Sequence, residues 1–178
     1  MDCVRLNRLP QIGRPHAAYT VVGSGKTGMD AILWLLEIGV PPRRIRWIMS
    51  RDAWLMNRAN FPPGLENFER SVGSNVDQFD AIGASSSVPE LFEALEAREQ
   101  LLRIDTNVQP TTYRCAVVSQ TELVQLRRIE DIVRMGHVRS VEPMRLVLDK
   151  GTLAPARGPE RLADAMPAEL LRGVHARR

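Results

Sequence analysis

Six residues near the start of the chain have the types and spacing of a phosphate-binding turn. They follow the pattern G-x-G-x-x-G and are Gly23, Ser24, Gly25, Lys26, Thr27 and Gly28. In such a turn the first glycine permits the tight bend, the second lets the backbone approach a pyrophosphate, and the third lets the following helix pack closely on the preceding strand. Backbone N–H groups and the positive end of the helix then face the phosphates. The spacing therefore predicts a dinucleotide phosphate site at residues 23–28, and a purely structural glycine-rich turn is the alternative.

The residues on either side of this motif predict a strand, a helix and a second strand. Residues 18–22 are a short apolar and β-branched run, residues 27–38 have the length and composition of a buried helix, and residues 45–49 are again strand-like. Gly39 stands where a helix C-cap belongs, and two prolines follow soon after it. The whole unit takes about 32 residues, the size expected of a β-α-β unit. The motif therefore lies where a phosphate-binding turn has to lie.

The end of the second predicted strand indicates which dinucleotide would bind. NAD-binding units place a carboxylate here for the ribose 2′-hydroxyl, whereas a nearby arginine suits the 2′-phosphate of NADP. Ser50 and Arg51 follow this strand, and Asp52 comes only after them. A serine hydroxyl can donate to a phosphate, and a guanidinium can pair with it through two parallel hydrogen bonds. We therefore expect NADP rather than NAD, and a solvated Arg51 is the alternative.

The segment Gly25-Lys26-Thr27 also has the form of the end of a P-loop. The pattern G-x-x-x-x-G-K-[ST] requires its first glycine at position 20, where this chain has Thr20. The sequence also shows no strand that ends in an aspartate able to hold the magnesium ion. Nucleotide hydrolysis therefore ranks behind dinucleotide binding.

The rest of the chain predicts further helices and strands around this unit. We expect a helix over 88–102, a strand over 113–118, and a helix that opens with a capping box formed by Ser119 and Glu122. Residues 50–87 are expected to be irregular, with a short helix over 75–82. Three β-like stretches, 132–135, 138–142 and 144–148, predict an antiparallel meander.

These expectations combine into one fold class and three segments. The fold class is α/β, with a Rossmann-type parallel sheet flanked by helices and an antiparallel β meander. Residues 1–17 are expected to form a lead-in arm, residues 18–152 an NAD(P)-binding Rossmann-like domain, and residues 153–178 an irregular tail.

Composition limits the classes of partner. The 178 residues are 44% apolar, which is typical of a folded chain, and their net charge is +3. Arginines are dispersed and aromatic residues make up only 5%, so we expect no nucleic-acid partner.

No apolar run reaches the roughly 18 residues of a membrane span, and the N-terminus lacks the core of a signal peptide. We therefore expect a cytoplasmic protein without a membrane partner. The histidines and cysteines lack the spacing of metal ligands, so no metal is expected.

Residues 19–30 and residues 47–58 resemble the NADP-binding segment of flavin-containing monooxygenase-like and pyridine nucleotide-disulfide oxidoreductase-like proteins. The similarity continues, more loosely, to about residue 152. Such proteins contain one Rossmann unit that holds FAD and a second, inserted into it, that holds NADPH. The resemblance implies that the pyrophosphate binds Gly23, Gly25 and Gly28 and that the 2′-phosphate binds Ser50 and Arg51.

The resemblance also implies a function, a flavin-dependent oxidoreductase in which hydride passes from nicotinamide to flavin. FAD would be the second cofactor, and a flavin-binding domain or chain the partner. No second G-x-G-x-x-G precedes Gly23, and residues 154–160 depart from the family's return to its FAD domain. We therefore expect a partial chain that binds NADP(H), lacks the FAD fingerprint and is not active alone. The alternative is a non-catalytic nucleotide-binding module or remnant. The sequence indicates neither catalytic residues nor an oxidised substrate.

Overall fold

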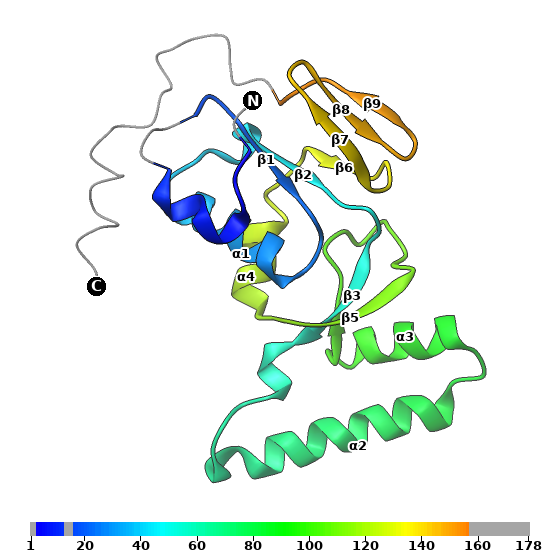
Figure 1. Ribbon diagram of the computed structural model, residues 1–178. Coiled ribbons are helices and arrows are strands. Elements are labelled where there is room, and N and C mark those ends of the chain that lie inside the picture. The colour runs from blue at the N-terminus through cyan, green and yellow to red at the C-terminus, as the bar shows by residue number, and fades with distance from the viewer. Residues whose placement is uncertain (1–2, 13–15, 157–178) are drawn as a thin grey trace. The chain divides into compact units, whose positions relative to one another are not determined.

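The computed structural model describes residues 3–12 and 16–156 (Figure 1). The chain divides into two compact units, the first over residues 1–51 and 125–178 and the second over residues 52–124. The described residues form helices together with both parallel and antiparallel sheets. The predicted α/β class is therefore confirmed at this level. The predicted domain over 18–152 takes in residues of both units.

The first unit is built on a three-stranded parallel sheet. β1 (Tyr19–Val22) pairs with β2 (Ile45–Ile48), and β2 pairs on its other side with β6 (Ile132–Val133). The helix α1 (Lys26–Glu37) connects β1 to β2. The β-α-β unit predicted from the sequence is therefore confirmed, with each boundary within one residue of its predicted place.

The sequence of α1 explains both where it packs and where it ends. Met29, Ile32 and Leu35 recur on one face and are almost completely buried. Gly39 has a φ of +87°, which is the left-handed conformation common just after a helix. The N–H of Val40 donates to the carbonyl of Leu35 at 2.9 Å, which closes the last turn. Gly39 thus ends the helix, as predicted. The short η2 turn (Pro42–Arg44) then leads into β2.

A second sheet in the first unit is an antiparallel meander. It consists of β7 (Val138–Glu142), β8 (Arg145–Leu148) and β9 (Gly151–Leu153). The meander is predicted correctly, but its predicted first strand is wrong. Ile132 and Val133 instead extend the parallel sheet, because the N–H of Met49 donates to the carbonyl of Val133 and the N–H of Trp47 to that of Asp131.

The predicted lead-in arm contains one short helical turn, η1 (Leu6–Gln11), whose Leu9 is buried. The predicted tail lies outside the described residues from position 157 onward.

The second unit contains its own three-stranded sheet and two helices that lie side by side (Figure 1). β3 (Ala53–Asn57) is central, antiparallel to β4 (Leu101–Leu102) and parallel to β5 (Thr112–Val118). The helices are α2 (Phe68–Ala84) and α3 (Val88–Ala97). Two short turns, η3 (Arg58–Asn60) and η4 (Leu65–Asn67), lead from β3 into α2. The short helix α4 (Gln120–Leu126) runs across the boundary between the units.

The sequence predicts this second unit less well than the first. Residues 50–87 are not irregular, because they hold β3 and the 17-residue helix α2. The helix expected over 88–102 ends at Ala97, and its last predicted residues form β4. The capping box is confirmed: the N–H of Glu122 donates to Ser119 Oγ at 3.1 Å, and the N–H of Ser119 donates to Glu122 Oε2 at 2.7 Å. Among the helices that the structure describes, none combines the length and the apolar character that a membrane crossing requires.

Candidate functional site

The first glycine of the motif makes the turn that joins β1 to α1. Gly23 has a φ of +115°, a conformation that favours glycine over residues with a side chain. Its N–H donates to the carbonyl of Ile48 at 2.9 Å, and its carbonyl accepts from the indole Nε1 of Trp47 at 2.8 Å. Both backbone groups of Gly23 are therefore tied to β2, which holds the turn at the carboxyl end of that strand.

The third glycine allows α1 to approach this turn. A Cβ at position 28 would overlap the backbone carbonyl oxygen of Gly23. The same oxygen is the acceptor of the Trp47 indole, so it cannot move away without losing that bond. Gly28 is thus required for the close packing of helix and turn, as the motif predicts.

The second glycine is different, because the fold itself does not require it. Gly25 is the N-cap of α1, with φ −86° and ψ 174°, values open to any residue. In the described part of the chain, a Cβ at this position would meet no heavy atom within 4 Å. Helix N-caps usually carry a side chain that accepts from the first N–H groups, but no described side chain caps α1. Gly25 therefore leaves open space directly in front of the helix N-terminus.

Ser24 and Lys26 supply the polar side chains of the turn. Ser24 is only 5% exposed, and its Oγ has no hydrogen-bond partner among the residues that the structure describes. Buried hydroxyl groups are normally hydrogen-bonded, so this one calls for a partner. Lys26 Nζ pairs with Asp30 Oδ1 at 2.5 Å, one helical turn further on. Such a solvent-accessible pair contributes little to stability, so it does not prevent the ammonium group from binding a phosphate. Thr27 is exposed.

Ser50 and Arg51 lie just beyond the carboxyl end of β2. Met49 is buried, Ser50 is partly buried and Arg51 is exposed. Because β1, β2 and β6 are parallel, their carboxyl ends lie at one edge of the sheet, and ligands of open α/β sheets bind at this edge. The turn 23–28 and the pair Ser50 and Arg51 therefore belong to the same edge.

The structure adds two residues that the sequence analysis does not identify as part of the site. Trp47 holds the turn through its indole N–H. Arg134 follows β6 directly and is partly buried, so a second arginine comes after a strand at this edge. The β-like pattern of residues 132–135 signals a strand just before Arg134, but the pattern does not show that this strand joins the parallel sheet rather than the meander. No set of His, Cys, Asp and Glu within residues 3–12 and 16–156 could hold a metal ion.

Comparisons with known proteins find relatives without an assigned activity. No family model and no solved structure matches the chain. Matching curated proteins come from Mycobacterium bovis and from two strains of Mycobacterium tuberculosis, and each is described as an uncharacterized protein. Each is 51% identical to this chain over 156 residues, which cover 86% of this chain and 28% of the relative. The chain thus spans less than a third of the length of the curated relatives it matches. These names identify neither a cofactor nor a reaction, so the resemblance to flavin-dependent enzymes stays a prediction.

Proposed function

We propose that this chain is the NADP(H)-binding portion of a flavin-dependent, monooxygenase-like oxidoreductase. The turn over residues 23–28 binds the pyrophosphate, and Ser50 and Arg51 bind the 2′-phosphate. The observation that carries the proposal is the difference between Gly25 and Gly28.

A purely structural turn accounts for two of the three glycines. Gly23 needs its positive φ, and Gly28 needs the absence of a Cβ beside the carbonyl oxygen of Gly23. Gly25 has an ordinary backbone conformation and open space around its missing side chain. The fold does not explain why position 25 is a glycine, but a ligand would explain it, because a pyrophosphate has to approach the backbone at this position.

Two further features of the turn favour an anionic ligand. The start of α1 carries no side-chain cap among the described residues, so its positive end faces the open space beside Gly25. The Oγ of Ser24 is buried and lacks a partner within the described chain, and it can donate to a phosphate oxygen. Both features fit a dinucleotide phosphate.

The sheet of the first unit is interpreted as one half of a Rossmann-type sheet. Its strand order, β1-β2-β6, is that of three parallel strands added successively in one direction. The second unit, residues 52–124, is then part of the connection between the second and third strands. This interpretation puts the proposed NADP site at the carboxyl edge, where such sheets bind their ligands.

The proposed role of this chain is binding and orientation. NADPH, when bound, supplies a hydride, and in the family that this chain resembles a flavin accepts it. The 178 residues contain a single G-x-G-x-x-G, so no residue is assigned to FAD. The flavin would come from another domain or another chain. The single fingerprint also favours the second candidate, a nucleotide-binding module without turnover of its own.

Cofactor preference tests this proposal. Titration calorimetry of the full chain should give tighter binding of NADPH than of NADH. Arg51→Ala should weaken NADPH binding by about tenfold, as expected for a lost charge-assisted hydrogen bond, and leave NADH binding unchanged. Arg114→Ala removes an exposed arginine of β5 outside the proposed site and serves as the matched control. Tighter binding of NADH by the natural chain, or an equal loss for both cofactors in Arg51→Ala, would contradict the assignment.

A further inference from the structure

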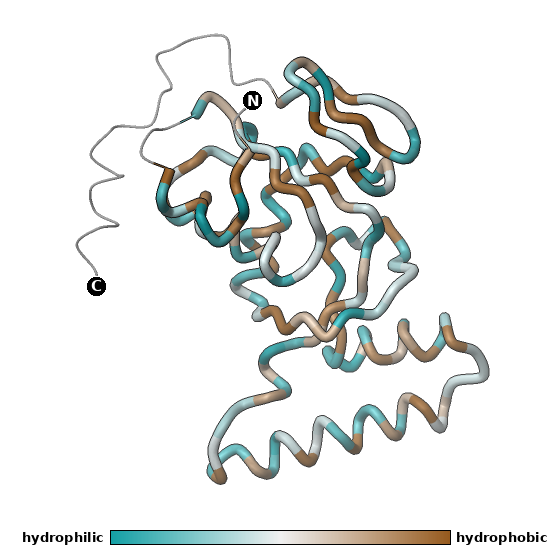
Figure 2. Tube along the Cα trace, in the orientation of Figure 1, coloured by the Kyte–Doolittle hydropathy of each residue, from teal (hydrophilic) through white to brown (hydrophobic). Residues whose placement is uncertain are grey.

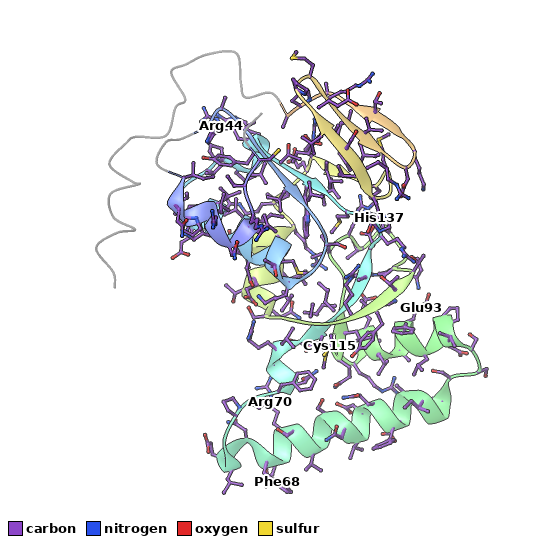
Figure 3. All side chains as sticks on the ribbon, in the orientation of Figure 1. Arg44, Phe68, Arg70, Glu93, Cys115 and His137 are labelled. Atoms are coloured by element: carbon purple, nitrogen blue, oxygen red, sulfur yellow. The ribbon has the colours of Figure 1, made fainter. Side chains whose placement is uncertain are left out.

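The helix α2 displays a stripe of large apolar side chains. They come from α2 and from the short turn before it, and each is between 42% and 90% exposed. They are Leu65, Phe68, Val72, Val76, Phe79 and Ile82. Figure 2 shows apolar residues recurring along this helix, and Figure 3 labels Phe68 at its start, on the side away from α3. We call this set the α2 stripe.

The face of α2 that packs on its own unit is largely polar instead, with Ala81 as its one fully buried apolar residue. Ser74 is buried, and its Oγ donates to Gln100 Oε1 at 2.6 Å. Gln78 Nε2 donates to the same oxygen at 3.3 Å, and Gln100 Nε2 donates to Asp77 Oδ2 at 3.4 Å. These bonds hold the helix in its present rotation. The usual arrangement, with the apolar face on the core and the polar face toward water, is therefore not the one that α2 adopts.

Five of the six residues of the α2 stripe have the spacing of a helix–helix seam, and Val76 lies beside that seam. Steps of three and four residues alternate along Leu65, Phe68, Val72, Asn75, Phe79 and Ile82. These are the a and d positions of a heptad repeat, which insert into a facing helix. A single polar residue, Asn75, lies among them, and polar residues at such positions commonly set the register of a pair.

The pattern is complementary to itself when a second copy runs antiparallel. With a two-fold axis between positions 73 and 74, Leu65 faces Ile82 of the second copy and Phe68 faces its Phe79. Val72 faces Asn75 beside the axis. The four outer apolar side chains then meet one another in pairs, as a two-fold symmetric interface requires.

Area favours a second copy as the occupant, and charge disfavours an anionic membrane. The six residues are 42–90% exposed, which amounts to an exposed area on the order of 700 Å² per copy, somewhat below the roughly 800 Å² per partner of a standard stable interface. Residues 65–84 also carry four acidic side chains, Glu66, Glu69, Asp77 and Asp80, against one basic side chain, Arg70. A helix with this charge is repelled by an anionic lipid surface.

We propose that α2 is a dimerization helix, through which two copies of this chain pair antiparallel along the α2 stripe. This inference is independent of the cofactor site, because every residue in it belongs to the second unit.

Analytical ultracentrifugation of the full chain tests the pairing. The natural chain should sediment as a dimer at micromolar concentrations, and Phe79→Ser should raise the dissociation constant about tenfold or more, as for an aromatic side chain that anchors an interface. Met144→Ser removes a similarly exposed apolar side chain from the first unit and should leave the dimer intact. Far-UV circular dichroism checks that each variant is folded. A natural chain that stays monomeric, including one that binds anionic vesicles instead, would overturn the proposal, as would a dimer that Phe79→Ser leaves unchanged.

Cysteine cross-linking tests the antiparallel direction. With Cys3 and Cys115 replaced by serine, the single variant Phe79→Cys should not cross-link on mild oxidation, because the two copies of position 79 lie far apart. The double variant Phe68→Cys/Phe79→Cys should give a covalent dimer. Efficient cross-linking of the single variant would indicate a parallel pair and overturn the proposed geometry.

Discussion

The helices α1 and α2 are both amphipathic, but they use their apolar faces in opposite ways. α1 buries Met29, Ile32 and Leu35 and leaves open space at its N-terminus. α2 buries Ser74 and exposes Phe79. A periodic apolar pattern therefore shows which face of a helix avoids water, but it does not show what covers that face. In α1 the cover is its own unit, and the proposed function lies at the uncovered end. In α2 the proposed cover is a second copy of the chain.

The largest effect is expected where α1 meets its turn. Gly28→Ala adds a Cβ that overlaps the Gly23 carbonyl oxygen, and this oxygen is held by Trp47. We expect a loss of about 3 kcal/mol in the free energy of unfolding of the first unit, the upper range for overpacking. Gly25→Ala, where the added Cβ meets open space, should cost less, at most about 1 kcal/mol, because alanine is a poorer helix N-cap than glycine but overlaps no atom. Thermal unfolding followed by circular dichroism measures both. Equal melting temperatures for the two variants would remove the structural distinction between these glycines.

The next effect concerns the polar face of α2. Gln100→Leu removes the acceptor of Ser74 Oγ and of Asn60 Nδ2 and leaves a buried hydroxyl proton without its acceptor. The expected cost is about 1–3 kcal/mol, measured by urea unfolding. Gln109→Leu changes an exposed glutamine of the same unit and is the matched control. If Gln100→Leu stabilises the protein, α2 is not held by these polar contacts, and the contrast with α1 is lost.

A smaller effect is expected at the indole that holds the turn. Trp47→Phe keeps an aromatic side chain in the core but removes the 2.8 Å hydrogen bond from Nε1 to the carbonyl of Gly23. We expect a loss of about 1 kcal/mol, visible as a lower midpoint of urea unfolding. An unchanged midpoint would mean that this bond does not hold the turn in place.

The smallest effect concerns the meander of the first unit. The N–H of His137 and the guanidinium of Arg139 donate to the carboxylate of Asp149 and lower its pKa from 3.8 to about 2. The charged form is thus favoured in the folded protein. Its contribution to stability is fully present above pH 4 and is lost as the pH falls from about 4 to about 2. Asp149→Asn should therefore lower the melting temperature slightly at pH 5, and the difference from the natural chain should shrink toward pH 2. A difference that stays constant over this range would contradict the assignment.

The first unit could be predicted from the sequence because its signals are local. β1, the glycine motif, α1 and β2 follow one another within residues 19–48, so each supports the interpretation of the next. The pairing of β6 could not be predicted, since two residues carry no information about which sheet they join. The same lack of information hides Arg134, whereas the motif residues and Arg51 stand next to strong local signals and are predicted from the sequence.

The second unit could not be predicted for two reasons. Its strands pair with partners that are distant in the sequence, and its long helix packs through its polar face instead of its apolar face. β3 is defined by partners far along the chain: Leu55 pairs with Leu102, and Trp54 pairs with Tyr113. β4 has only two residues, too few for a periodic pattern. In α2, glycines and serines lower the intrinsic helix propensity, and the face that packs on the unit is polar. Bonds such as that between Ser74 and Gln100, 26 positions apart, become visible only in three dimensions.

The central claim, that residues 23–28 bind a dinucleotide phosphate, is tested most directly by Gly25→Val. The backbone conformation of Gly25 is open to any residue and the space around it is open, so the variant should fold, with a melting temperature lowered only slightly by the poorer N-cap residue. The valine side chain would occupy the space that the pyrophosphate needs. Titration calorimetry with NADPH should therefore show binding to the natural chain and an affinity at least about tenfold weaker, or no detectable binding, for Gly25→Val. Equal affinities in two folded proteins would contradict the account.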